Sequence, residues 1–398
     1  YPENYIIVNI FGVINADLRN FEKALVCFTK AIKINPNYAK AYLNLGSSLN
    51  NLGRFEDAIF SYSKAIEIEP KYQDAHFNLG KTFNDLGKFE DAIISYSEAI
   101  KLKPNFPEAY TNLIKILTFY KPKKKIINSC IETNELLQNI NYGYNFNKPI
   151  SDENVITFFN KCNDIITKKI GKIEISETQI YRNNSIDLNC KRHFKVFDAF
   201  NVIPEFCFGC FKVQIELKSI MELFKLYFVF DNLNLKNNNS RKCMLELRKN
   251  ISGTYKGYIY CSSLSEADVI KDQISPILKE KINENVTAIV KRGCSEFGLS
   301  YPEYKNINEK KYKLMSYKKE WKIKESIIDN ELAKKNVSKT KISKENLHGA
   351  SISDILVMRN WLGFAKKIGD LSYEKITKKV NIPDFIQNDL SNQLSKRI

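Results

Sequence analysis

The stretch Ala39–Tyr72 reads AKAYLNLGSSLNNLGRFEDAIFSYSKAIEIEPKY, and its pattern recurs on both sides with a period of 34 residues. Tyr5–Tyr38 before it and Gln73–Phe106 after it follow the same plan, which is a helical segment, a short turn, a second helical segment and a proline near the end. Self-similarity at such a period is typical of solenoids, in which each helical hairpin buries its apolar side against the next. The sequence therefore predicts an N-terminal α-solenoid of three stacked hairpins.

The recurring residues have distinct packing roles. The second and third repeats share, in pairs, Leu45 and Leu79, Gly46 and Gly80, Ala58 and Ala92, Tyr62 and Tyr96, Ala65 and Ala99, and Pro70 and Pro104, and the first keeps Phe11, Gly12, Ala24, Phe28, Ala31 and Pro36. Small residues let two helices approach closely, large residues fill the space between repeats, and proline ends the second helix. This spacing resembles the tetratricopeptide repeat over about residues 5–120. The resemblance implies a scaffold that binds proteins or peptides.

A fourth helix, Pro107–Tyr120, follows in phase but has Ile114 where the repeat has glycine. We interpret it as the helix that covers the end of the array, so that the repeat domain spans residues 1–120. The chain is already in phase where it starts, which is compatible with further repeats before Tyr1.

An asparagine occupies the same place in successive repeats, at Asn44, Asn78 and Asn112. A carboxamide donates and accepts hydrogen bonds at once, so a column of them can hold the backbone of an extended peptide. The column resembles the asparagine ladder in the repeats of O-linked N-acetylglucosamine transferases, and it implies peptide binding on the concave face. Asparagine is also frequent throughout this chain, so composition alone explains the recurrence equally well.

The net charge of +16 comes from the part of the chain after the repeats. Residues 1–120 carry 13 basic and 13 acidic side chains, residues 121–398 carry 48 and 32, and residues 301–398 alone carry 21 and 12. A basic excess favours nucleic acid, acidic proteins or anionic membranes, but lysines interspersed with glutamates favour an ordinary solvated surface. Nine scattered cysteines favour a reducing cytoplasm. No apolar run is long enough to span a membrane.

The region from about 203 to 298 reads β-α-β-β-α-β. Alternating apolar and polar residues predict strands over Phe211–Leu217, Arg241–Lys249, Tyr255–Cys261 and Val286–Arg292. Capping boxes that start at Ser219 and Ser263 open the two helices between them. This order predicts a ferredoxin-like sandwich, with both helices on one face of an antiparallel sheet.

The alternation assigns residues to the two faces of this sheet. Facing the helices we expect Phe211, Val213, Ile215, Cys243, Leu245, Leu247, Ile259, Cys261 and Val290, and on the open face Lys212, Gln214, Glu216, Glu246, Arg248, Lys256, Tyr258, Tyr260 and Lys291. The segment Lys256–Tyr260 partly resembles the third strand of an RNA-recognition motif, which implies that bases stack on Tyr258 and Tyr260. Ile259 departs from that motif. A face covered by another part of the chain explains the aromatic residues as well.

Two short pairs of metal-binding residues precede the first strand. Cys190 and His193 are separated by two residues, as are Cys207 and Cys210, and 13 residues lie between the pairs. Each pair can form a knuckle with two soft ligands, and four protein ligands make a closed, structural Zn²⁺ site. The same residues suit an iron–sulfur cluster less well, because His is a less common ligand there. Four unrelated residues are the remaining alternative.

Catalytic patterns are not found. Only three histidines are present, and no nucleophile–base pair or phosphate-binding glycine loop is evident. Arg292-Gly293-Cys294-Ser295-Glu296 suits a nucleophile beside a carboxylate, but a strand that ends in a turn explains it equally.

We therefore predict a multidomain α and α+β protein. The repeat domain (1–120) is followed by a helical transition (121–186), a zinc-knuckle and ferredoxin-like domain (187–300) and a basic helical tail (301–398). The predicted function is a protein-binding scaffold with an accessory zinc-stabilised domain. The alternatives are an enzyme of unrecognised type whose repeats recruit a protein substrate, and RNA binding through the open face of the sheet.

Overall fold

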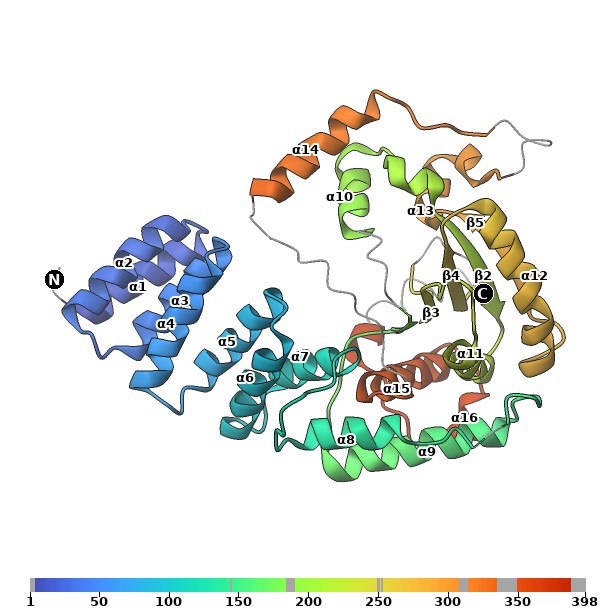
Figure 1. Cartoon of the computed structure of the whole chain (residues 1–398), viewed down its shortest axis with the longest axis horizontal. Coiled ribbons are helices and arrows are strands. Elements are labelled where there is room, and N and C mark those ends of the chain that lie inside the picture. Colours follow the sequence, from blue (N-terminus) through green and yellow to red (C-terminus); the bar gives the residue numbers. More distant parts are fainter. Residues whose placement is uncertain are drawn as a thin grey trace. The chain divides into compact units, whose positions relative to one another are not determined.

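The computed structural model of the chain describes residues 4–143, 145–183, 190–248, 251, 253–307, 314–334 and 349–387. Two compact units are distinguished within it. Unit 1 comprises Tyr1–Ile131 and Asp329–Ile342, and unit 2 comprises Glu132–Ile328 and Ser343–Ile398. Figure 1 labels their helices and strands.

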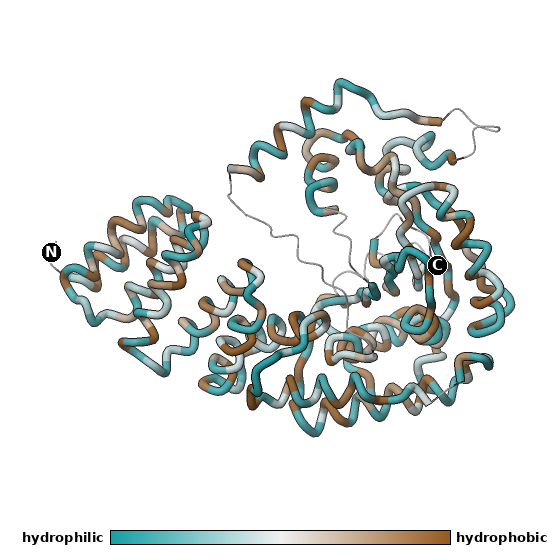
Figure 2. The backbone as a smooth tube through the Cα atoms, in the orientation of Figure 1, coloured by the Kyte–Doolittle hydropathy of each residue, from teal (hydrophilic) through white to brown (hydrophobic). Residues whose placement is uncertain are grey.

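Unit 1 contains the predicted helical hairpins. Its helices are α1 (Tyr5–Asp17), α2 (Phe21–Ile34), α3 (Ala39–Asn51), α4 (Phe55–Ile68), α5 (Gln73–Asp85), α6 (Phe89–Leu102) and α7 (Pro107–Leu117). The pairs α1–α2, α3–α4 and α5–α6 form hairpins, each hairpin contacts the next, and α7 packs on α6 (Figure 1). Figure 2 shows hydrophobic and hydrophilic residues alternating along these helices, as expected for helices that bury one side.

Glycine and an aromatic residue meet where the two helices of a hairpin come closest. A Cβ atom at Gly46 would lie 2.7 Å from a ring carbon of Tyr62, and one at Gly80 would lie 2.9 Å from the ring of Tyr96. Real side chains do not tolerate such distances, so glycine permits the approach. The packing reason given for the repeat pattern is therefore confirmed.

The turn inside each hairpin uses a residue in the left-handed conformation. Gly53 and Gly87 have φ of 77° and 73°, and Arg19 occupies the same place in the first repeat with φ of 60°. Glycine adopts this conformation readily, whereas a residue with a Cβ atom pays roughly 1–2 kcal/mol. The first repeat therefore departs from the others at its turn.

Unit 2 is built on a five-stranded antiparallel sheet with the order β1-β3-β4-β2-β5. The strands are β1 (Gln179–Arg182), β2 (Phe211–Leu217), β3 (Arg241–Leu245), β4 (Tyr255–Cys261) and β5 (Thr287–Arg292). The four strands predicted from alternation are present, although β3 is shorter than predicted. The fifth, β1, was not predicted, and it pairs with β3 at the edge of the sheet.

Two helices connect these strands, α11 (Ile220–Asn232) and α12 (Leu264–Lys281). The hydroxyl of Ser219 accepts a hydrogen bond from the N–H of Glu222 at 3.3 Å, and that of Ser263 accepts one from the N–H of Glu266 at 3.1 Å. Both predicted helix starts are therefore confirmed. The two helices pack on the sheet and on each other.

Cys243 lies on the side of the sheet that faces α11. It pairs with Gly257, and a Cβ atom at that glycine would collide with Leu226 of α11. Cys243 is 2% exposed and Cys261 is 7% exposed. Both cysteines are packing residues, as the alternation predicted.

Segments far along the chain complete the core of unit 2. The helices α9 (Asp152–Lys169) and α15 (Ile352–Lys367) pack on α11. On α15, Trp361 is fully buried and its indole N–H donates to the carbonyl of Thr178 at 2.9 Å. We expected residues 301–398 to form a basic tail. In the structure, α15 lies in the core, because its apolar residues are enclosed and its lysines are at its end.

The remaining helices are α8 (Ser129–Gln138), α10 (Cys190–Phe200), η1 (Glu205–Gly209), α13 (Ser295–Ser300), η2 (Pro302–Lys305), α14 (Trp321–Lys334) and α16 (Tyr373–Ile376). Several of them enclose a second apolar cluster of Val196, Val202, Ile203, Cys207, Phe297, Tyr304, Trp321 and Ile328. No helix among the described residues is long and apolar enough to cross a membrane.

Candidate functional site

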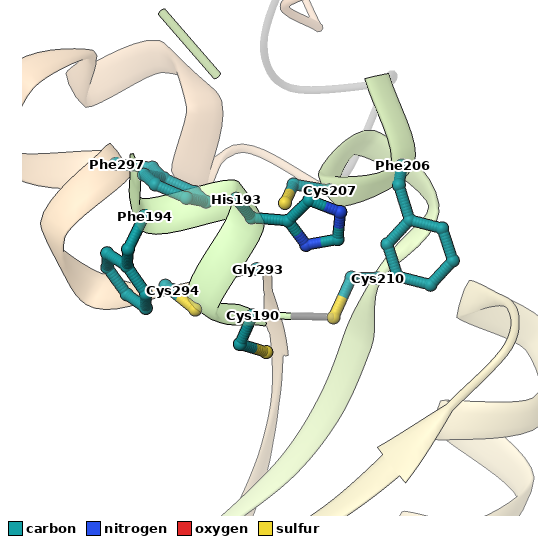
Figure 3. A pocket seen from close by; sticks show the side chains of 9 residues that line it. All are labelled: Cys190, His193, Phe194, Phe206, Cys207, Cys210, Gly293, Cys294 and Phe297. Atoms are coloured by element: carbon teal, nitrogen blue, oxygen red, sulfur yellow. The ribbon is translucent and has the colours of Figure 1, made fainter. Parts of the chain in front are cut away.

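The four predicted metal ligands line one small cavity in unit 2 (Figure 3). The lining residues are Cys190, His193, Phe194, Phe206, Cys207, Cys210, Gly293, Cys294 and Phe297. The cavity measures about 10 Å³, which is close to the room that one water-sized sphere needs. Two knuckles far apart in the sequence are therefore brought together, as the spacing predicted.

Local structure explains why the knuckles point to the same place. Cys190 and His193 are three residues apart on α10, so they share one face of that helix. Cys207 lies in η1, and the N–H of Cys210 donates to its carbonyl at 3.3 Å, which closes the second knuckle. The hydroxyl of Tyr304 donates to the same carbonyl at 2.5 Å and ties this knuckle to the second apolar cluster.

Cys294 is a further thiol at the cavity that sequence reasoning did not connect with the other four residues. It directly follows β5, and the N–H of Gly293 donates to the carbonyl of Cys210 at 2.7 Å. The ammonium of Lys212 on β2 donates to the sulfur of Cys294 at 3.4 Å. No spacing rule relates Cys294 to residues so far back in the chain, and only the pairing of β2 with β5 brings them together.

The buried thiols of this cavity are protonated at neutral pH when no metal is bound. Burial raises the pKa of Cys207, and the neighbouring thiols add to this. Burial also raises the pKa of Cys210, to about 11, although Lys212 opposes the shift. A thiol with a raised pKa is a poor nucleophile, whereas a metal that binds it must displace the proton. The chemistry of these donors therefore suits a soft metal ion better than thiol redox catalysis.

The donors are not yet in coordination geometry. Among the described residues, no group of three or more His, Cys, Asp or Glu side chains is arranged to hold a metal ion as it stands. Tetrahedral binding at about 2.0–2.3 Å would therefore require the thiols to rotate toward a common centre.

The face of the sheet that we expected to be open is closed. Tyr258 is 4% exposed, Tyr260 is 8% exposed and Lys256 is 1% exposed. Glu246, just beyond β3, forms an ion pair with Arg248 at 2.7 Å and lies 3.7 Å from the ammonium of Lys256. These contacts leave no accessible ring surface for bases to stack on, so the interpretation of this face as an RNA site was wrong.

The lysines enclosed on this face lie against tyrosine rings. The ammonium of Lys212 is 5.7 Å from the ring centroid of Tyr258 and 5.2 Å from that of Tyr260. Burial lowers the pKa of Lys242 on β3 to about 8 and that of Lys291 on β5 to about 8. The alternation had assigned Lys212, Tyr258, Tyr260 and Lys291 correctly to one face. It could not show that later segments cover that face.

In unit 1, the asparagines of the repeats lie on the first helices of their hairpins. Asn44 is on α3, Asn78 on α5 and Asn112 on α7, and all three are partly exposed. The amide of Asn44 donates to the side-chain oxygen of Asn9 on α1 at 3.0 Å, and Asn9 itself is buried. One member of the column is therefore held by the preceding repeat.

Known protein families match only the repeats. Tetratricopeptide-repeat models match residues 39–72 and 61–94, and a model described as a TPR repeat matches residues 16–53 and 80–113. No curated protein matches the chain.

Several solved structures resemble part of the chain. The first TPR of Spaghetti (RPAP3) bound to an HSP90 peptide is 24% identical, with a TM-score of 0.28 over 29% of this chain and 92% of that one. The first TPR domain of human RPAP3 is 25% identical, with a TM-score of 0.29 over 29% and 91%. The Arabidopsis OM64 TPR domain is 23% identical, with a TM-score of 0.28 over 28% and 93%. From the sequence models, residues 16–113 are a tetratricopeptide-repeat segment.

Proposed function

We propose that the repeats form a protein-binding scaffold that holds an extended peptide along Asn44, Asn78 and Asn112. The observation that carries this proposal is one partly exposed asparagine at the same place in successive hairpins. The helix α3 contacts both α1 and α5, so the first helices lie next to one another. Neighbouring helices pack about 8–10 Å apart, which is about the length of three residues of extended chain. Each asparagine would thus meet every third residue of the peptide.

The charge of the repeats indicates what kind of peptide fits. Residues 1–120 carry equal numbers of basic and acidic side chains, 13 of each. Recognition through carboxamides and the peptide backbone does not depend on ion pairs, so binding should change little with salt. The partner is therefore an extended segment selected by its backbone and shape.

The test is selection of binders from a display library of random peptides by the full chain. For a selected peptide, Asn78→Ala should weaken binding about tenfold, because it removes hydrogen bonds worth about 1–1.5 kcal/mol. The matched control is Asn51→Ala, since Asn51 is exposed on α3 and its amide bonds to the carbonyl of Ser47 at 2.8 Å. Equal loss of affinity in both variants, or strong salt dependence, would contradict the proposal.

For unit 2 we propose a ferredoxin-like sandwich, with β1 added at its edge. Support comes from the order β3-β4-β2-β5 within the sheet and from two connecting helices that contact each other. We further propose that the knuckles of Cys190, His193, Cys207 and Cys210 bind a structural zinc ion. All nine cysteines are free thiols, which supports a reducing compartment such as the cytoplasm.

A further inference from the structure

The geometry points to Cys294 as the fourth thiolate of the metal site, together with Cys190, Cys207 and Cys210, in the place that the sequence spacing assigns to His193. This inference rests on the metal proposal made above, and it changes the ligand set. It also assigns Lys212 as the cation that neutralises the site. Each step follows from contacts that only the folded chain creates.

The backbone holds Cys294 beside the second knuckle. Gly293 has φ of 52°, and its N–H donates to the carbonyl of Cys210 at 2.7 Å, so the chain turns next to that residue. Cys294 then lines the same cavity as the other three thiols, and Figure 3 shows the four sulfur atoms around it. Because β2 and β5 are paired up to Phe211 and Arg292, the position of Cys294 is as well defined as that of Cys210.

His193 is packed in a different way. Its ring is stacked on Phe206, with centroids 5.1 Å apart and an angle of 22° between the planes. Phe206 is itself 54% exposed. The imidazole is therefore at the outer rim of the cavity beside an exposed ring, where it can shield a metal centre without binding it.

Lys212 provides an independent indication of negative charge at this place. Its side chain is 7% exposed, and its ammonium donates to the sulfur of Cys294 at 3.4 Å. Within the described ranges no carboxylate forms an ion pair with Lys212. A buried ammonium without a counter-ion is costly, and tyrosine rings at more than 5 Å offset only part of that cost. An anionic centre at Cys294 would supply the missing charge.

A four-thiolate zinc site has the required charge. When Zn²⁺ binds four thiols, four protons are released and the centre carries two negative charges, one more than a centre with three thiolates and an imidazole. An N–H group that donates to a ligating sulfur orients the ligand and stabilises the centre. The metal would then join α10, η1 with the start of β2, and the turn after β5, which are the elements that enclose the second apolar cluster.

The test uses the full chain, purified under reducing conditions, with Zn²⁺ and Co²⁺ as probes. Metal content is measured by elemental analysis, affinity by competition with a chelator, and ligand type by the absorption of bound Co²⁺. We expect one metal ion per chain and the Co²⁺ spectrum of four thiolates. Cys294→Ser should lower the affinity at least tenfold and weaken the sulfur-to-cobalt band. His193→Asn should leave both unchanged.

Two further variants guard against misfolding. Cys294→His keeps a ligand at this place, so it should retain the metal and shift the Co²⁺ bands toward a site with one imidazole. Lys212→Met should lower metal affinity about 10–100-fold while the spectrum keeps its shape. Cys27→Ser is the control, because Cys27 lies in unit 1.

Three results would overturn the inference in distinguishable ways. Loss of binding in His193→Asn but not in Cys294→Ser would restore the original ligand set and leave the metal proposal intact. A chain that binds neither Zn²⁺ nor Co²⁺ would remove the metal proposal itself. Rapid alkylation of Cys294 in such a metal-free chain would identify Cys294 and Lys212 as a nucleophile and its activating cation. Bound iron with the same dependence on Cys294 would support the ligand set and change the metal.

Discussion

In unit 1 each close contact between helices is made again 34 residues later, whereas the central contacts of unit 2 are made once and join distant segments. Gly46 meets Tyr62 just as Gly80 meets Tyr96. In unit 2, Arg182 on β1 bonds to Asp354 on α15, 172 residues away. A repeated local contact leaves a period in the sequence and a single distant contact leaves none. The two units should therefore respond differently to substitution.

The largest effect is expected at Arg182 of unit 2. Its side chain forms ion pairs with Asp231 at 2.5 Å and with Asp354 at 3.0 Å, and all three side chains are 6% exposed. Arg182→Met would leave two buried carboxylates without their cation, which costs about 3–5 kcal/mol. Trp321 and Trp361, the only tryptophans, lie in unit 2. Tryptophan fluorescence during denaturant unfolding therefore reports this loss.

The control for Arg182 is an exposed ion pair in unit 1. Arg54 pairs with Asp57 at 2.7 Å, but both side chains are more than half exposed. Arg54→Met should cost less than about 1 kcal/mol. Similar losses in the two variants would mean that burial does not distinguish these pairs and that the comparison of the units is unsound.

A smaller effect is expected at Gly46 of unit 1. In Gly46→Ala, the new Cβ atom would lie 2.7 Å from the ring of Tyr62, so the helices must move apart. Overpacking of this kind costs about 1–3 kcal/mol, and the better helix propensity of alanine returns about 1 kcal/mol. The helical signal in circular dichroism should show the net loss, while tryptophan fluorescence should not. A shift of equal size in both signals would show that the two units unfold as one.

The sequence was sufficient where a rule is local. The period located every repeat helix, the serines at 219 and 263 located two helix starts, and alternation located four strands. It was insufficient where a distant segment completes the structure. The edge strand β1 is only four residues long, and nothing in Tyr258 or Tyr260 indicates that Glu246 and Arg248 close the face above them.

The candidate metal site follows the same division. Two short-spaced pairs were readable because each knuckle is formed by neighbouring residues. Cys294 was not, because its contact with Lys212 spans 82 residues and depends on the pairing of β2 with β5. Its surroundings in the sequence suggested only a turn or an isolated nucleophile. The cysteine that a turn places beside a knuckle becomes visible only in the folded sheet.

The smallest expected effect concerns Glu266, where a local signal in unit 2 also serves a distant contact. Glu266 accepts hydrogen bonds from the amides of Asn237 and Asn239 at 2.7 and 2.9 Å and from the N–H of Ser262 at 2.6 Å. Burial raises the pKa of Glu266, but these hydrogen bonds outweigh it and lower the pKa to about 2. The folded state therefore binds the proton less readily than the unfolded state does.

The sign of the pH dependence follows from this shift. The stabilisation by ionised Glu266 is fully present above its ordinary pKa of 4.5 and is lost as the pH falls toward about 2. Glu266→Gln should be less stable than the unchanged protein at pH 7, and the difference should shrink between about pH 4.5 and pH 2. Unfolding followed by tryptophan fluorescence at several pH values measures it. The matched control is Glu98→Gln in unit 1, whose partner is Lys101 at 3.2 Å. A difference at Glu266 that stays constant with pH would show that the carboxylate is stabilised equally in the folded and unfolded states, and that the capping box acts only through its local hydrogen bonds.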